Sequence, residues 1–123
     1  MTDLASLTAK LLAFRDERNW KQFHTLKDLI ISLNLEAAEL LELTQWKPDA
    51  ELARLKSDER FRECLRDECA DVLLYLLLIA EDAGIDLMQA AESKLVKNTA
   101  KYPVDKFYGS AKKYSEKDEG PAS

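Results

Sequence analysis

The sequence predicts an all-α protein, a four-helix bundle followed by a polar tail. The 123 residues include only 3 Gly and 3 Pro, and a chain with few helix breakers and many Leu, Ala, Glu and Lys favours helices throughout. Apolar residues recur at helical spacing in four long segments. Hydrophobic residues make up 46% of the chain and charged residues 33%, which is typical of a globular protein with its own core. We place the folded domain at residues 1–105 and the tail at residues 106–123.

The first two long helices are predicted from their apolar stripes and end signals. The second helix begins after the N-cap pair Thr25 and Asp28. It runs to about Trp46, because the residue before Pro48 avoids the α region. Apolar residues occupy two sides of this helix, so it is either central in the bundle or also packs against another subunit. The first helix covers about residues 3–19, and its stripe consists of Leu4, Leu7, Leu11, Leu12 and Phe14.

The ends of the remaining helices are marked by glycine, proline and capping residues. Gly84 ends the third long helix, and Asp86 with Gln89 forms a capping box for the fourth. Pro103 ends the fourth helix near Lys101. Beyond it the chain becomes polar and has little to bury, which predicts a mobile tail. The predicted ranges are residues 49–56 for a short helix, 57–83 for the third long helix, which begins at Ser57 or Asp58, and 86–101 for the fourth.

Four acidic side chains fall on inward-facing parts of two helices. Glu36 and Glu39 flank the apolar face of the second helix, while Glu68 lies inside the main apolar stripe of the third helix and Asp71 at its edge. A single helical Glu is ordinarily a surface charge, but four inward acids would repel one another and lose solvation. A hard divalent cation such as Mg²⁺ resolves both problems, and helical bundles build such carboxylate sites. A di-iron or di-manganese site is not favoured, since its usual form needs Glu-x-x-His twice and the chain has one histidine, His24.

Composition also excludes several classes of protein. A formal net charge of −5 does not fit a groove for a nucleic-acid polymer. The longest apolar run, residues 72–80, is too short to span a membrane, and no signal peptide is expected. Cys64 and Cys69 lie five residues apart on a predicted helix, a spacing that fits neither a C-x-x-C site nor a disulfide framework. We expect reduced, packed thiols in a cytoplasmic protein.

The two acid pairs carry a family resemblance. Glu36-x-x-Glu39 followed by Glu68-x-x-Asp71 resembles the metal signature of the all-α nucleoside triphosphate pyrophosphohydrolases, the MazG-like group. The stretches FRDERNWKQFHTLKDL, LEAAELLELTQWK and SKLVKNTAKYPVDK resemble the dCTP pyrophosphatase branch, and the resemblance covers about residues 10–105. It implies Mg²⁺-dependent cleavage of a (d)NTP, favouring dCTP or a related pyrimidine nucleotide, to the monophosphate and pyrophosphate. Such an enzyme cleans the nucleotide pool, and the family assembles as a homodimer or homotetramer with active sites near the subunit interfaces.

Together, the acid pairs and the family resemblance predict which residues bind the metal and carry the catalysis. Glu36, Glu39, Glu68 and Asp71 are expected to bind Mg²⁺ and to carry the catalysis, with one carboxylate activating the attacking water. Glu42 could also activate it, but we expect Glu42 to be an ordinary solvated side chain.

Cations for the phosphates are expected from the fourth long helix. Lys94, Lys97, Asn98 and Lys101 share one of its faces. A solvated basic face near a helix C-terminus would explain that pattern equally well, but beside an acid cluster we favour phosphate binding. The expected phosphate-binding residues are Lys94, Asn98, Lys101 and Tyr102.

Aromatic residues around the second helix are candidates for stacking on the base. Trp46 and His24 come first and Trp20 second, although core or interface packing is the ordinary role of each tryptophan. Two other functions stay open: a non-catalytic helical oligomerisation module, and a nucleotide-binding regulatory module. The preferred base, the choice between dimer and tetramer, and the identity of the general base are likewise left open.

Overall fold

The computed structural model describes residues 2–110, and every regular element among them is helical, which confirms the predicted all-α class. These residues form two compact units, the first ending at Ile85 and the second beginning at Asp86. The first unit contains α1 (Leu4–Glu17), the 3₁₀ turn η1 (Lys21–Phe23), α2 (Leu26–Glu42), α3 (Asp49–Leu55) and α4 (Glu59–Ala83). The second unit contains α5 (Leu87–Lys101) and α6 (Val104–Phe107). None of the helices in this part of the chain combines the length and apolar character needed to cross a bilayer.

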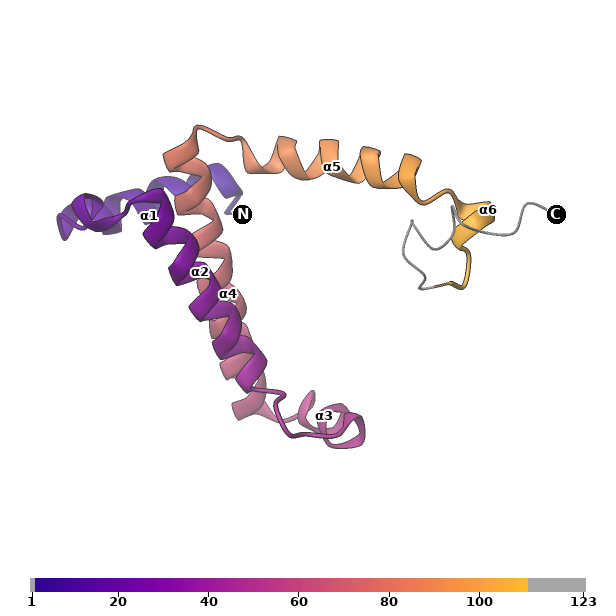
Figure 1. The fold of residues 1–123 in the computed structure, drawn as a ribbon. Helices are drawn as coiled ribbons and strands as arrows, with labels where there is room; N and C mark the ends of the chain where they lie inside the picture. Colours follow the sequence, from indigo (N-terminus) through magenta and orange to yellow (C-terminus); the bar gives the residue numbers. More distant parts are fainter. Residues whose placement is uncertain (1, 111–123) are drawn as a thin grey trace. The chain divides into compact units, whose positions relative to one another are not determined.

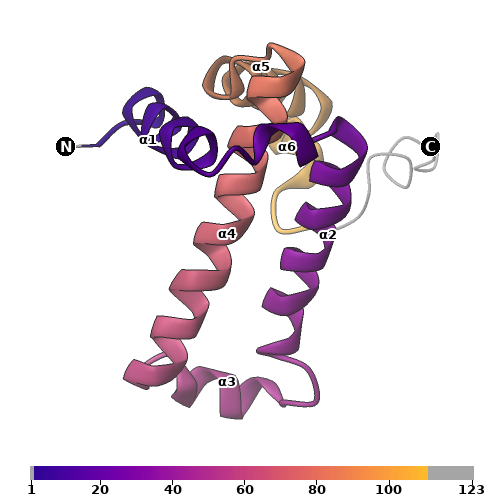
Figure 2. The same ribbon diagram turned by 90° about the vertical axis from the view of Figure 1, so that its left-hand side faces the viewer.

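In the first unit, α2 and α4 run side by side in opposite directions, and α3 connects them at one end (Figures 1 and 2). Helix α1 packs against α4. The buried core lies where the start of α2 meets the last turns of α4. It consists of Leu29 from α2 with Leu77, Leu78 and Ala80 from α4.

Side-chain caps begin the long helices at the positions where the sequence signals them. The carboxylate of Asp58 accepts a hydrogen bond from the backbone N–H of Phe61 at 2.9 Å, and Asp86 accepts one from Gln89 at 3.1 Å. Each cap satisfies one of the backbone donors left open in the first helical turn. Gly84 ends α4 with a left-handed φ of 67°, a conformation that a side chain would strain. The Thr25 hydroxyl caps α2 in the same way, accepting from Asp28 at 3.1 Å.

Helix α2 is shorter than predicted. It ends at Glu42, with Leu43 as its C-cap, and not at about Trp46. The backbone N–H groups of Thr44 and Gln45 donate to the carbonyl of Leu41, so the chain turns there before it reaches the proline. Trp46 therefore lies outside the helix.

Burial along α4 is uneven. From residue 71 to residue 80 every position is at least half-buried, as the continuous apolar sequence predicts. The first half of the helix is different, because only the face that bears Phe61, Leu65 and Glu68 is covered. The prediction of packed thiols was wrong: Cys64 and Cys69 lie off this face and are exposed, and both are free.

The first unit also leaves apolar side chains uncovered on α2. Ile31 is 46% exposed and Leu35 62% exposed. These two residues lie on the side of α2 away from Leu29, so the helix is apolar on two sides, as predicted.

The predicted polar tail lies mostly outside the described residues. Its first part, to residue 110, includes the end of α6 and a turn in which the N–H of Ser110 donates to the carbonyl of Phe107. Residues 111–123 are not described.

Candidate metal centre

Two neighbouring helices bring three of the four predicted acids together. Glu36 and Glu39 lie one turn apart on α2, and Glu68 lies on α4. One carboxylate oxygen from each of these three side chains falls within 4.8 Å of the other two. The cluster arises because the antiparallel pair places the middle of α2 beside the first half of α4 (Figure 2).

Asp71 lies one turn further along α4 and is not one of this close group of three. It is half-buried. Its charge nevertheless reaches the cluster, since repulsion from Asp71 contributes to the raised pKa of both Glu36 and Glu68.

The acids of the cluster are crowded together and partly buried, and both conditions raise pKa values. The pKa of Glu36 is raised from its ordinary value of 4.5 to about 7, first by burial and then by the hydrogen bond and the charge of Glu39. The pKa of Glu68 is raised by the same causes in the same order. Glu39 itself is exposed. Loss of hydration and mutual repulsion both disfavour the charged forms, so without a counter-charge the cluster retains protons that isolated carboxyls would release.

The oxygens of the cluster fit a hard divalent cation. Oε2 of Glu36 and Oε2 of Glu68 are buried and have no hydrogen-bond partner among residues 2–110. A buried carboxylate oxygen without a partner is unfavourable unless a proton, a donor or a cation satisfies it. Carboxylate oxygens on facing helices are the donor set that Mg²⁺ and related ions prefer. Glu36, Glu39 and Glu68 are thus the residues that could hold such an ion, and Asp71 is close enough to add to the charge.

The three aromatic candidates lie outside this cluster, in the same unit. Trp46 is 91% exposed and has a φ of 66°, which is rare for a bulky residue. Trp20 is 44% exposed and follows Asn19, whose φ is 53°. A bulky residue held at a positive φ, as Trp46 is, occurs mostly where the surrounding structure or a function requires it.

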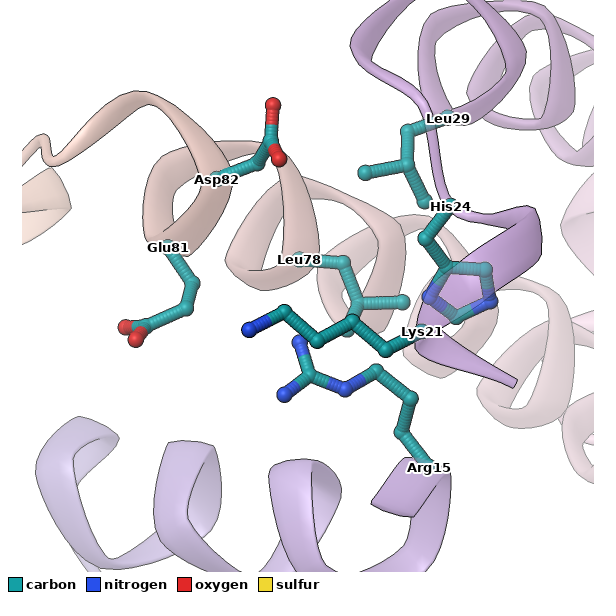
Figure 3. A pocket seen from close by; sticks show the side chains of 7 residues that line it. All are labelled: Arg15, Lys21, His24, Leu29, Leu78, Glu81 and Asp82. Atoms are coloured by element: carbon teal, nitrogen blue, oxygen red, sulfur yellow. The ribbon is translucent and has the colours of Figure 1, made fainter. Parts of the chain in front are cut away.

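His24 occupies a different setting, at the edge of a cavity of about 160 Å³. Figure 3 shows its ring beside Leu29 and Leu78, with charged side chains around the opening. Nδ1 of His24 is buried and has no hydrogen-bond partner within the described part of the chain. Leu29 lies two helical turns before Glu36, which places the cavity about 10 Å from the acids along α2. The other residues that line it are Arg15, Lys21, Glu81 and Asp82.

Sequence reasoning did not find this cavity. Its cations come from α1 and η1 and its acids from the last turns of α4, so no short motif contains them. The charged residues are at positions 15, 21, 81 and 82, and their spacing does not indicate a shared cavity.

The predicted phosphate-binding residues lie in the second unit. Lys94 and Lys101 are exposed on α5, and Asn98 is half-buried between them. Tyr102 follows as the C-cap, and its N–H donates to the carbonyl of Asn98 at 2.8 Å. The Tyr102 ring meets Phe107 edge-on at 5.0 Å between ring centres. These residues therefore lie along the second half of α5 and its C-cap, and their approach to the acids stays a prediction.

Comparisons with known proteins agree on one family. The model of the MazG-like family matches residues 31–116, a range that includes both acid pairs. The dCTP pyrophosphatase 1 of Bos taurus is 39% identical over all 123 residues, which correspond to 71% of that protein. The dCTP pyrophosphatase 1 of Homo sapiens is 37% identical over the same shares of the two chains.

A solved structure supports the same conclusion. A pyrophosphatase from Archaeoglobus fulgidus superimposes with a TM-score of 0.75 at 40% sequence identity, covering 84% of this chain and 94% of that one. The family match spans most of the chain and the curated relatives match its full length. This chain belongs to the MazG-like family.

Proposed function

We propose that this chain is a nucleoside triphosphate pyrophosphohydrolase that uses Mg²⁺ and favours dCTP or a related pyrimidine deoxynucleotide. The observation that carries the proposal is the cluster of Glu36, Glu39 and Glu68, with two buried oxygens that no described residue partners. The relatives support the reaction, since those at 37–39% identity are dCTP pyrophosphatases and the similar solved structure is a pyrophosphatase.

In the proposed reaction, water forms a new P–O bond and the bridge between the α- and β-phosphates breaks. The products are the nucleoside monophosphate and pyrophosphate. Mg²⁺ would neutralise phosphate charge and orient the phosphorus for in-line attack. The residues that would hold it are Glu36, Glu39, Glu68 and Asp71. One of these carboxylates accepts the proton of the attacking water.

Recognition of the rest of the nucleotide falls to other residues. Lys94 and Lys101, with Asn98 and Tyr102, are proposed to bind the phosphates, because lysine ammonium groups act as mobile point charges for phosphate. Trp46 is the leading candidate to stack on the base, since 91% of its surface is exposed. Trp20 and His24 are the further candidates.

We further propose that the protein works as a homodimer or homotetramer in the cytoplasm, where it removes unwanted deoxynucleotides. The exposed apolar residues of α2 support assembly with a second copy. The two free cysteines fit a reducing compartment.

The experiment is a panel of NTPs and dNTPs incubated with purified protein and Mg²⁺, with identification of both products. We expect release of pyrophosphate and the monophosphate, fastest from dCTP or a related pyrimidine deoxynucleotide. Glu39→Gln and Asp71→Asn should abolish release and leave the helical circular dichroism signal intact. Glu63→Gln is the matched control, because Glu63 is an exposed acid on α4. An absence of pyrophosphate from every nucleotide would refute the proposal and favour a non-catalytic module.

A further inference from the structure

A small cluster of aromatic and cationic side chains lies at the end of α1. The guanidinium carbon of Arg18 lies 3.8 Å from the centre of the Phe14 ring and 5.9 Å from the centre of the Trp20 ring. The Phe14 and Trp20 rings meet edge-on, with 5.6 Å between their centres and 78° between their planes. Arg18 therefore contacts one ring face and approaches the second ring, which itself touches the first.

The backbone holds this cluster in one arrangement. Nη1 of Arg18 donates to the carbonyl of Phe14 at 2.9 Å, which satisfies a carbonyl in the last turn of α1. Asn19 then takes a left-handed conformation, one that asparagine tolerates better than most residues. The N–H of Trp20 donates back to the carbonyl of Arg15 at 3.1 Å. The turn thus fixes where the Trp20 side chain begins, and Arg18 with Phe14 restricts where its ring can point.

This cluster contributes little to the core. Phe14 is 45% exposed and Trp20 is 44% exposed, and neither belongs to the buried set around Leu29. An exposed cation–π contact contributes only modestly to stability. Ordering an exposed tryptophan is useful chiefly when its free surface must meet a ligand, because an already ordered side chain loses less freedom on binding.

We propose that Arg18 is a positioning residue that holds the Trp20 indole in the orientation that receives the nucleotide base. The inference rests on the proposed function, in which Trp20 is a base-stacking candidate. Arginine suits the task because its planar guanidinium stacks on an aromatic face while its N–H groups bond a carbonyl. Lysine would keep the charge but lose the planar contact.

The test follows the Trp20 ring and nucleotide affinity separately. Protein labelled with 5-fluorotryptophan gives one ¹⁹F NMR signal for each of the two tryptophans, and Trp46→Phe assigns them. Affinity for dCTP is measured by equilibrium titration with Ca²⁺, so turnover is not needed, and kcat and KM are measured with Mg²⁺. The variants are Arg18→Met and Arg18→Lys. Arg62→Met is the matched control, since Nη1 of Arg62 also donates to a backbone carbonyl, that of Lys56, but no ring contact involves it among the described residues.

We expect Arg18→Met to shift or broaden the Trp20 signal and to weaken dCTP binding about fivefold, the size of an exposed cation–π contact. At saturating dCTP, kcat should stay within about twofold, because the chemical step occurs at the acids. Arg18→Lys should restore part of the affinity, and Arg62→Met should match the unmodified protein.

Two results would overturn the inference. One is an unchanged Trp20 signal in Arg18→Met, and the other is a changed signal with unchanged affinity for dCTP. Failure of the proposed function looks different, because no nucleotide would then release pyrophosphate in the unmodified protein, whatever the Trp20 signal does.

Discussion

At the scale of single residues, Glu36 contributes to the pH response of the metal-free protein. Its pKa is about 7 in the folded chain, against an ordinary value of 4.5, chiefly because of burial. Between these two values the folded protein binds a proton that the unfolded chain releases. The resulting stabilisation is fully present below about pH 4.5 and is lost as the pH rises through about 7.

We therefore expect the metal-free protein to lose stability between about pH 5.5 and about pH 8. Glu36→Gln should lose less over the same range, because the amide carries no charge at either pH. Urea denaturation with a chelator present, at both pH values, gives the two free energies of unfolding. Equal losses in the original and the variant would show that Glu36 is not responsible.

Glu68 provides a second prediction at this scale. Its unpartnered oxygen and its close approach to Glu36 and Glu39 imply that Mg²⁺ binds the folded state and raises its melting temperature. Glu68→Gln should abolish this rise, while Glu63→Gln, at an exposed position of the same helix, should retain it. Differential scanning calorimetry with and without Mg²⁺ measures the effect. A rise that persists in Glu68→Gln would remove that residue from the metal site.

At the scale of elements, α5 is predicted to contribute phosphate contacts and no chemistry. Lys94→Gln should raise KM about tenfold, the effect of losing one charge-assisted hydrogen bond, and should change kcat much less. Steady-state kinetics with dCTP checks the prediction. Lys106→Gln is the control, because Lys106 is an exposed lysine on α6 in the same unit. Equal effects of the two substitutions would indicate a general charge effect and not a site.

At the scale of the whole molecule, the two-sided apolar character of α2 predicts assembly. We expect sedimentation to give a particle of two or four chains of 14.0 kDa. Leu35→Glu should shift it toward the monomer, since a charge at a buried interface is unfavourable. Ser57→Glu adds the same charge at an exposed position and should leave the assembly unchanged. A monomer in the unmodified protein would contradict the prediction.

The parts of the fold that could be predicted from the sequence are those that depend on local signals. The caps at Asp58 and Asp86 and the stop at Gly84 depend on neighbouring residues alone, and the structure has all three. The approach of Glu36, Glu39 and Glu68 also followed from helical periodicity, because inward faces of paired helices must meet. The roles of these residues stay predictions.

Features that depend on packing escaped prediction. The early end of α2 reflects a turn before the proline that propensity does not specify. Cys64 and Cys69 looked buried within an apolar helix, yet the first half of α4 is covered on one face only. The placement of Arg18 against the Phe14 ring and near the Trp20 ring depends on the left-handed turn at Asn19, which no sequence motif predicts.

The central claim is that acids from α2 and α4 share one divalent ion. Anomalous diffraction from crystals grown with Mn²⁺, a substitute for Mg²⁺ that also prefers oxygen ligands, tests it most directly. The account predicts a strong anomalous peak about 2 Å from carboxylate oxygens of Glu36, Glu39 and Glu68. A well-ordered site at which these oxygens hold no Mn²⁺, while the ion lies elsewhere or is absent, would contradict it.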